Sequence, residues 1–313
     1  MAITVIDISK YQGAADWDRI GAAVASGEIG AVIIRASFGT VGGVMPDAQF
    51  GRNRDLARVK AVPRGFYHFA YPGRSMGTVQ ATALAKLLGP LQPGEIVALD
   101  MESETTQGRA LVATDVAWAV EFCTTFRLQT GVLPLLYTDS STLRRFDWTP
   151  VRDLGVRLWV ASYGADTGSP GTPPATAPWG KHALWQYSQN AKLAGFRKVD
   201  ASLMDGTVAD FCAMGRPSQP PLPPIITPQL PEEIRAMFTT TNYLEACQIV
   251  RALYRAYGRD PDEGGPAGDE QGETYWMRQL ARAARDGSPF QPILMELLGQ
   301  LDAAWIQYNS GKG

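Results

Sequence analysis

Short apolar runs alternate with longer amphipathic segments over the N-terminal part of the chain. Runs of four to eight residues rich in Val, Ile, Leu and aromatic residues are typical of buried strands, and apolar residues three or four apart are typical of helices. The pattern predicts strands at residues 4–8, 31–36, 64–70, 96–101, 133–137, 157–161, 183–187 and 207–211. Between them it predicts helices that include 17–25, 50–60, 78–88 and 114–128.

Eight strands that alternate with helices predict an α/β fold, an irregular (β/α)8-like barrel of about 210 residues. The active sites of such barrels lie at the C-terminal ends of the strands. We therefore expect one mouth of the barrel to gather Asp7, Tyr67, His68, Asp100, Glu102, Tyr137, Tyr163, Trp185 and Gln186.

A proline-rich stretch divides the chain. Prolines occupy positions 217, 220, 221, 223, 224, 228 and 231, a density that favours polyproline II and excludes a helix or sheet interior. We expect a barrel over residues 1–214, a Pro-rich linker over 215–231 and a small all-α domain over 232–313. In that last part, apolar and aromatic residues recur at helical spacing from Leu244 to Tyr257.

Composition narrows the classes of function. A net charge of −2 at pH 7 argues against nucleic-acid binding, and no apolar run reaches the length of a membrane span. The first residues lack the basic region of a secretory signal, so we expect synthesis in a reducing cytoplasm. Three cysteines without CxxC spacing predict no disulfide framework, and two histidines cannot form an HExxH zinc site.

The most informative pair of residues is Asp100 and Glu102, at the end of the apolar run 96–101. Side chains at i and i+2 of a strand share a face, with α-carbons roughly 6.6 Å apart. Such close like charges raise the pKa of one carboxyl, and partial burial is expected to raise that of Glu102 further. A protonated carboxyl beside an ionised one suits glycosidic bond cleavage. The pair alone leaves open two solvated acids or a metal site.

Several segments, in order, match the pattern of one enzyme family. They read VIDISKYQG at 5–13, IIRAS at 33–37, GFYHF at 65–69, LDME at 99–102, LWVASY at 158–163 and LWQY at 184–187. Over about residues 3–212 the chain thus resembles the lysozymes of glycoside hydrolase family 25, muramidases common in phage endolysins and bacteria. It departs from the family at Val5, where glycine is usual, and at Asp200-Ala201-Ser202, where Asp-x-Asn is usual.

The resemblance implies hydrolysis of the β-1,4 bond between N-acetylmuramic acid and N-acetylglucosamine in peptidoglycan, with no metal or cofactor. Glu102 would be the general acid and later the base. Asp100 would hold an oxazolinium-like intermediate, act as a nucleophile or tune the pKa of Glu102. Asp7 would support the two acids, or alternatively cap a turn at Ser9.

The resemblance also implies residues that contact the sugars. Aromatic side chains suit stacking on sugar faces or hydrogen bonding to an N-acetyl group, although each is equally suited to ordinary barrel packing. The candidates are Tyr67, Tyr137, Tyr163 and Trp185, together with Asp200 and Arg35. For Arg35, contact with muropeptide carboxylates competes with an internal salt bridge. His68 points to the opposite face from Tyr67 and is expected to be structural.

Three biological settings are open. The leading hypothesis is a phage endolysin that reaches the cell wall through a holin, with a helical module that binds the wall. The second is a virion tail-associated muramidase, whose module docks onto phage tail proteins. The third is a catalytically inactive barrel that binds glycan or serves as a structural part, although the presence of Asp7, Asp100 and Glu102 together argues against it.

Overall fold

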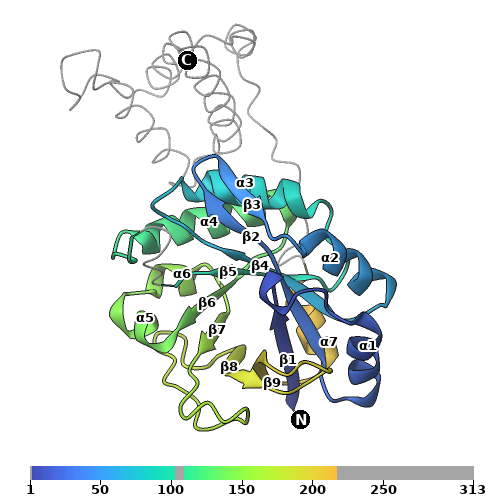
Figure 1. The fold of residues 1–313 in the computed structure, drawn as a ribbon. Coiled ribbons are helices and arrows are strands. Elements are labelled where there is room, and N and C mark those ends of the chain that lie inside the picture. The colour runs from blue at the N-terminus through green and yellow to red at the C-terminus, as the bar shows by residue number, and fades with distance from the viewer. Residues whose placement is uncertain (1, 103–108, 217–313) are drawn as a thin grey trace, which may run out of the picture. The chain divides into compact units, whose positions relative to one another are not determined.

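The computed structural model describes residues 2–102 and 109–216, which form a closed barrel of strands with helices outside it (Figure 1). The barrel strands follow one another in sequence order, and the last pairs back with the first. They are β1 (Ala2–Ile8), β2 (Ala31–Thr40), β4 (Arg64–Phe69), β5 (Ile96–Asp100), β6 (Leu135–Asp139), β7 (Leu158–Ala161), β8 (Leu184–Ala191) and β9 (Val199–Asp205).

Strand β9 differs from the others in direction. It is antiparallel to both of its neighbours, β8 and β1, whereas the other barrel strands are parallel to one another. An antiparallel neighbour can be reached by a short connection, and residues 192–198 suffice between β8 and β9. Because β9 runs backwards, its first residues lie at the end of the barrel where the parallel strands finish.

The helices cover the outside of the barrel unevenly (Figure 1). The longer ones are α1 (Trp17–Ser26), α2 (Phe50–Val59), α3 (Gly77–Leu88) and α4 (Asp115–Thr130), and the shorter ones are α5 (Ser140–Arg145), α6 (Thr149–Asp153) and α7 (Val208–Ala213). A 3-10 turn, η1 (Lys10–Gln12), follows β1. The connection 162–183 between β7 and β8 is described throughout and contains no helix. The predicted irregular (β/α)8-like barrel is therefore confirmed.

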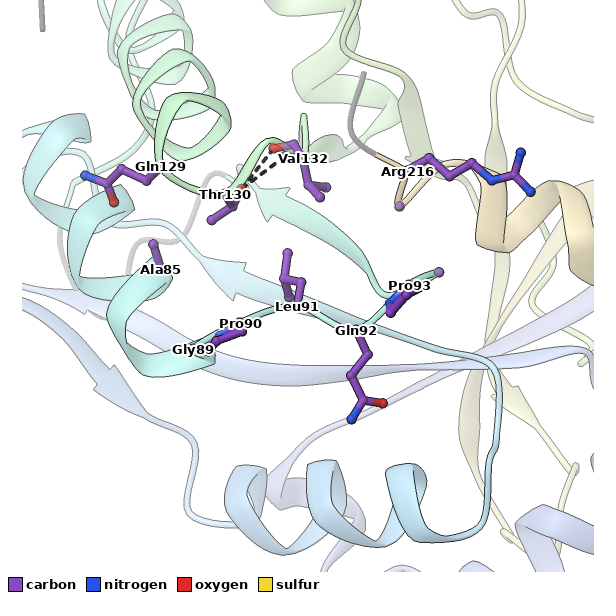
Figure 2. A pocket seen from close by; sticks show the side chains of 12 residues that line it. Ala85, Gly89, Pro90, Leu91, Gln92, Pro93, Gln129, Thr130, Val132 and Arg216 are labelled. Atoms are coloured by element: carbon purple, nitrogen blue, oxygen red, sulfur yellow. Dashed lines mark hydrogen bonds between the residues drawn. The ribbon is translucent and has the colours of Figure 1, made fainter. Parts of the chain in front are cut away.

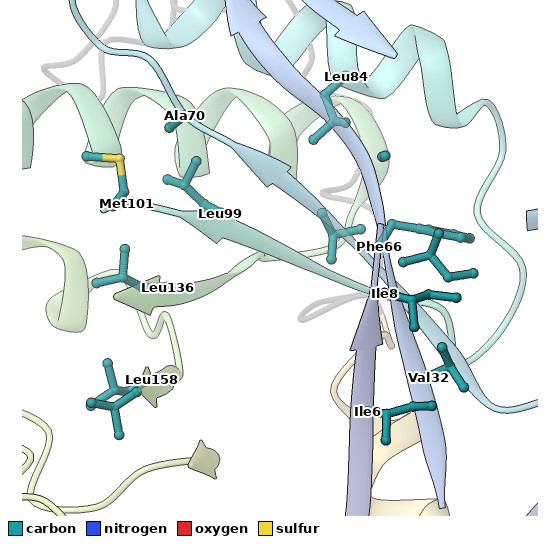
Figure 3. Close-up of a cluster of buried hydrophobic side chains, with 14 of the residues drawn as sticks. Ile6, Ile8, Val32, Phe66, Ala70, Leu84, Leu99, Met101, Leu136 and Leu158 are labelled. Carbon is teal, nitrogen blue, oxygen red and sulfur yellow. The ribbon is translucent and has the colours of Figure 1, made fainter. Parts of the chain in front are cut away.

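Alternation along the strands produces two separate apolar clusters. On β1, Ile6 and Ile8 belong to the layer between the sheet and the helices, part of which is drawn in Figure 3. Val5, on the opposite face, packs inside the barrel with Ile33 and Trp159. Since side chains of a strand alternate between its two faces, Asp7 must share the interior with Val5. The same alternation brings polar residues from several strands into one enclosed space.

Local signals set the boundaries of the helices. The side chain of Asp16 accepts hydrogen bonds from the backbone N–H groups of Asp18 and Arg19, which caps the first turn of α1. Gly27 ends that helix at φ 78°, a left-handed conformation that glycine adopts without a steric penalty. Gly131 ends α4 in the same conformation.

One predicted strand was wrong, and two strands were missed. Residues 208–211 are the first residues of α7, and Thr207 is its N-cap. The side chains of Thr207 and Asp210 form a capping box, which starts a helix where the short apolar run had indicated a strand. The eighth barrel strand is β9, which the sequence pattern did not separate from the loop before it. The sequence also gave no sign of β3 (Gly43–Pro46), a hairpin partner of β2 outside the closed barrel.

The linker beyond Arg216 and the helical domain lie outside the described residues, so their boundaries stay predictions. Within the described part of the chain, no helix combines the length and apolarity that a membrane span needs.

A buried ion cluster ties the base of the barrel together. The carboxylate of Glu95, which is 1% exposed, accepts hydrogen bonds from Arg58 of α2 at 2.8 Å and from Arg64 of β4 at 2.7 Å. The backbone N–H of Gln92 adds a further bond of 2.8 Å. Burial alone would raise the pKa of Glu95, but the bonds from Arg58, Gln92 and Arg64 outweigh it and lower the pKa.

We predict that Glu95→Gln lowers the free energy of unfolding by about 3 kcal/mol, because it leaves two arginines facing a neutral group. Since the folded-state pKa of Glu95 is lowered, its contribution is present at neutral pH and is lost on acidification, so the difference should shrink in acid. Urea melts followed by circular dichroism measure it. The control Asp55→Asn removes an exposed partner of Arg54 and should cost under about 0.5 kcal/mol. Equal losses would contradict the prediction.

Candidate active site

Acidic side chains from three strands meet at the mouth of the barrel. Asp7 lies near the end of β1, and Asp100 is the last residue of β5. Asp200, the second residue of β9, is the direct register partner of Asp7. The reversed direction of β9 explains why a residue at the start of a strand joins residues at the ends of others. Asp7 and Asp100 are each 5% exposed.

Gln186 of β8 organises the acidic group. Its side-chain amide donates to Oδ2 of Asp7 at 2.7 Å. Its oxygen accepts the hydroxyls of Tyr137 and Tyr163, each at 2.7 Å. An amide that donates to a carboxyl must turn its oxygen the other way, so both tyrosine protons point toward Gln186. Tyr163 also interacts with Tyr137: burial raises the pKa of Tyr163, and the hydrogen bond with Tyr137 acts against this effect.

Asp7 and Asp200 behave as one unit. Burial raises the pKa of Asp7 well above its usual value, and the charge of Asp200 raises it further, while the bond from Gln186 lowers it. Burial also raises the pKa of Asp200, to about 6. The hydrogen bond between the two carboxyls favours the ionised form of Asp200 and the protonated form of Asp7. The two carboxyls therefore titrate as a coupled pair, in which the charge of one disfavours ionisation of the other.

Asp100 is a buried carboxyl with an unused oxygen. Burial raises its pKa well above the usual value, and the charges of Glu102 and Asp7 raise it further. The guanidinium of Arg35 acts in the opposite direction. Among the described residues, Oδ1 of Asp100 has no hydrogen-bond partner. A buried acceptor without a partner is rare in folded proteins.

Glu102 lies beyond the end of β5 and is half-buried. It lines a pocket of about 250 Å³ together with residues 70–74, Arg109 and Leu111. Its charge contributes to the raised pKa values of Asp7, Asp100, Tyr137 and Tyr163. Electrostatically, Glu102 therefore belongs with the acidic group at the mouth, and it also lines a pocket.

Arg35 makes the internal salt bridge that the sequence analysis considered. Its Nε donates to Asp47 at 2.8 Å, and Nη2 lies 2.7 Å from the same carboxylate oxygen. Nη2 nevertheless has no hydrogen bond of good geometry within the described residues. Arg35 also pairs in register with Tyr67, and its charge acts on both Tyr67 and Asp100. Arg35 therefore forms the salt bridge with Asp47 and also acts on residues of the site.

The predicted aromatic residues divide into two groups. Tyr67 and Tyr137 pack against Trp159 inside the barrel, with ring centroids 6.5 and 4.6 Å apart, and Tyr163 is half-buried beside the same cluster. Trp185 is not brought together with them. It belongs to the layer between sheet and helices, and its indole N–H donates to the Ser162 carbonyl at 2.9 Å. Period-two alternation turns its neighbour Gln186 inward instead.

His68 is structural, as predicted. Its ring nitrogens lie 2.9 Å from Ser37 Oγ and 2.9 Å from Gln80 Oε1, and the ring stacks on Phe122. Burial lowers the pKa of His68 to about 4, so the ring is neutral at physiological pH. The sequence analysis placed Gln186 at the mouth without giving it a role. The signal was available, because Gln186 shares its strand face with the interior residue Leu184.

A larger pocket of about 560 Å³ lies at the other end of the barrel (Figure 2). It is lined by the ends of α3 and α4, the loop 89–94 before β5 and the residues Gly215 and Arg216. None of its lining residues is acidic, so its size does not make it a hydrolytic site. In the part of the chain that the structure describes, no three His, Cys, Asp or Glu side chains are grouped to hold a metal ion.

Comparison with known proteins identifies the family. The profile described as "Glycosyl hydrolases family 25" matches residues 6–196. The chain belongs to glycoside hydrolase family 25. The chain is also 28% identical over 221 residues to Lysozyme M1 of Streptomyces globisporus, a match that covers 67% of this chain and 70% of that protein. This glycoside hydrolase therefore carries the fold and the family that its sequence segments indicated.

Solved structures agree with this assignment. A bacterial lysozyme from Streptomyces coelicolor superposes with a TM-score of 0.58 at 27% identity, over 69% of this chain and 98% of that one. The catalytic domain of endolysin ply40, from bacteriophage P40 of Listeria monocytogenes, gives a TM-score of 0.54 at 25% identity, over 68% of this chain and 98% of that one. Both likenesses concern the barrel of this family 25 hydrolase.

We predict opposite pKa shifts of Asp7 in two variants. Asp200→Asn removes the neighbouring negative charge and should lower the pKa, whereas Gln186→Leu removes the amide donor and should raise it. Carbon-13 NMR titration of labelled aspartate carboxyls measures both. Asp205→Asn, at the far end of β9, serves as the control and should change nothing. Shifts of the same sign in the first two variants would contradict the proposed network.

Proposed function

We propose that the chain is a muramidase, which hydrolyses the β-1,4 bond between N-acetylmuramic acid and N-acetylglucosamine in peptidoglycan. The observation that carries the proposal is the gathering of Asp7, Asp100, Glu102 and Asp200 at one mouth of the barrel. Glycosidic bond cleavage needs acidic side chains in different protonation states, and close carboxyls in a buried site produce them. The lysozyme and endolysin relatives support this substrate.

Glu102 is the general acid that protonates the leaving oxygen, and afterwards the base that activates water. Of the two carboxyls at the end of β5, it is the more exposed and borders a pocket. A proton donor must come within hydrogen-bond reach of the bridging oxygen, so accessibility favours Glu102 over Asp100.

Asp100 stabilises an intermediate formed by the substrate's own acetamido group. Its 5% exposure is unfavourable for direct attack on an anomeric carbon, whereas its unpartnered Oδ1 is an acceptor for an amide N–H. A substrate-derived oxazolinium ion carries positive charge next to that oxygen, and a buried carboxylate stabilises it. Asp7 and Asp200 titrate as a coupled pair, and the charge of Asp7 acts on Asp100.

Substrate contacts fall to residues that line the interior. Tyr67 and Tyr163 are half-buried and suit contact with a sugar, and the oxygens of Tyr137 and Tyr163 accept hydrogen bonds from it. Arg35 and Asp200 complete this set. We assign no such contact to Trp185, because it is 3% exposed and its N–H is already used.

We further propose that the enzyme is a phage endolysin released to the wall by a holin, in which residues 232–313 bind the wall. The endolysin relative supports this setting. Sedimentation of the full-length Glu102→Gln variant with intact walls tests it, since that variant leaves the walls uncut. Co-sedimentation that a chain ending at Arg216 fails to reproduce is the expected result. Equal binding by both would favour the virion role, with phage tail proteins as partners.

We predict that Glu102→Gln lowers the rate of wall clearing by about 10²- to 10⁴-fold, the usual contribution of a general acid. Asp100→Asn should cost a comparable factor, and wild-type enzyme should cleave N-deacetylated walls poorly. Turbidity measures the rates, and mass spectrometry of the products should find muramic acid at the new reducing ends.

Glu28→Gln, an acid-to-amide change between α1 and β2, is the matched control and should keep full activity. Glucosamine at the new ends would make the enzyme a glucosaminidase. Full activity of Glu102→Gln would refute the acid assignment. A wild-type protein that clears no wall would favour the inactive barrel.

A further inference from the structure

The turn after β1 carries an unusual side chain for a surface. Tyr11, in the middle of η1 (Lys10–Gln12), is 78% exposed, which places it among the most exposed large apolar residues of the described chain. It follows Asp7 by four positions, at the end of the barrel where the acidic group lies. An exposed aromatic ring beside an active site is unfavourable in free energy, and contact with a ligand would remove that ring from water.

The turn that holds Tyr11 is fixed in place. Ser9 and Gln12 form a capping box, in which the Ser9 side chain accepts from Tyr11 N–H and the Gln12 side chain accepts from Ser9 N–H at 2.8 Å. The backbone N–H of Lys10 donates to Asp47 at 3.1 Å, and Asp47 is 3% exposed. Tyr11 therefore stands on a preorganised turn, which lowers the entropy lost on binding.

Two cations flank the ring. The guanidinium carbon of Arg35 lies 5.0 Å from the centroid of Tyr11, and the ammonium of Lys10 lies 5.4 Å from it. Asp47 neutralises Arg35, whereas Lys10 has no carboxylate within 4.0 Å among the described residues. The turn thus presents an uncompensated positive charge next to an aromatic hydroxyl, a combination that suits a carboxylate.

This cationic turn borders an acidic interior. Arg35 is near enough to Asp100 to lower the pKa of that carboxyl, and its guanidinium also lies against the ring of Tyr11, so one side chain connects the acidic group to the turn. A substrate with a neutral sugar and an anionic branch is oriented by such a gradient of charge. The sugar enters among the carboxyls, and the branch is repelled from them toward Lys10.

We infer that Lys10 and Tyr11 form a subsite for the free carboxylates of the peptide stem on peptidoglycan. The inference rests on the proposed function, since a muramidase substrate places that stem beside the bond being cut. The stem branches from the lactyl group of muramic acid and carries carboxylates that are absent from the sugar rings. Lys10 pairs with a stem carboxylate, and the hydroxyl of Tyr11 donates to it.

The experiment compares two soluble substrates prepared from teichoic-acid-free walls: glycan fragments with their stems, and the same fragments stripped by an amidase. For Lys10→Gln, we expect kcat/KM on stem-bearing fragments to fall about threefold, the effect of one exposed ion pair. The value on stripped fragments should not change. At 0.5 M NaCl the difference should disappear, because salt screens exposed charges.

Tyr11→Ala should lose at least as much as Lys10→Gln on the stem-bearing substrate, and Tyr11→Phe should lose less than Tyr11→Ala. Lys181→Gln makes the same charge change before β8, at the far end of the barrel, and should alter neither substrate. Each of these lysines and Tyr11 is exposed, so the variants are expected to fold.

The outcomes are distinct. An equal loss on both substrates would overturn the inference and point to a contact of Lys10 with the glycan that both substrates share. No loss on either would overturn it outright while leaving the muramidase assignment intact. A wild-type enzyme that cleaves neither substrate would overturn both the proposed function and the subsite.

Discussion

The site depends on keeping several carboxyl groups together in a space that excludes most water. Burial and mutual repulsion both disfavour the charged forms, and the pKa values of Asp7, Asp100 and Asp200 are raised accordingly. The groups that oppose this repulsion include a neutral donor, Gln186, and one cation, Arg35. Gln186 connects Asp7 to two tyrosines, and Arg35 supplies the nearby positive charge. Differing protonation states, which acid catalysis needs, follow from the same arrangement.

The direction of one strand makes this arrangement possible. Parallel strands alone would deliver Asp7 and Asp100 to the mouth, because both lie at strand ends. Asp200 lies near the start of β9 and reaches the same mouth only because that strand is reversed. The reversal also gives β1 an antiparallel neighbour on one side and a parallel one on the other, which closes the barrel. The pairing of β1 with β9 therefore both closes the barrel and places Asp7 opposite Asp200.

The sequence could predict the parts of this design that periodicity encodes. Continuous apolar runs located most strands, and the spacing of Asp100 and Glu102 identified the acidic pair. Strand direction is not encoded locally, so β9 was missed and residues 207–211 were assigned to a strand. When two successive residues of a strand are both apolar or amphipathic, the residue types alone do not show which of them faces the interior of the barrel. Trp185 was chosen over Gln186 for its ring, although register with the interior residues decides the matter.

The position of Arg35 links the chemistry inside the barrel to recognition at its rim. Asp47 accepts from Arg35 and from the backbone of Lys10, so one buried carboxylate fixes both the guanidinium and the turn that carries Tyr11. A change at Asp47 would then disturb catalysis and substrate orientation together, while Lys10 and Tyr11 influence orientation alone. Lys10 and Tyr11 lie on η1, whereas Asp7 and Asp100 lie on strands. Substitutions at Lys10 or Tyr11 can therefore change the preference for the substrate's branch without changing the acids. This separation requires the rim residues to be exposed and the acids to be at least half-buried, as they are here.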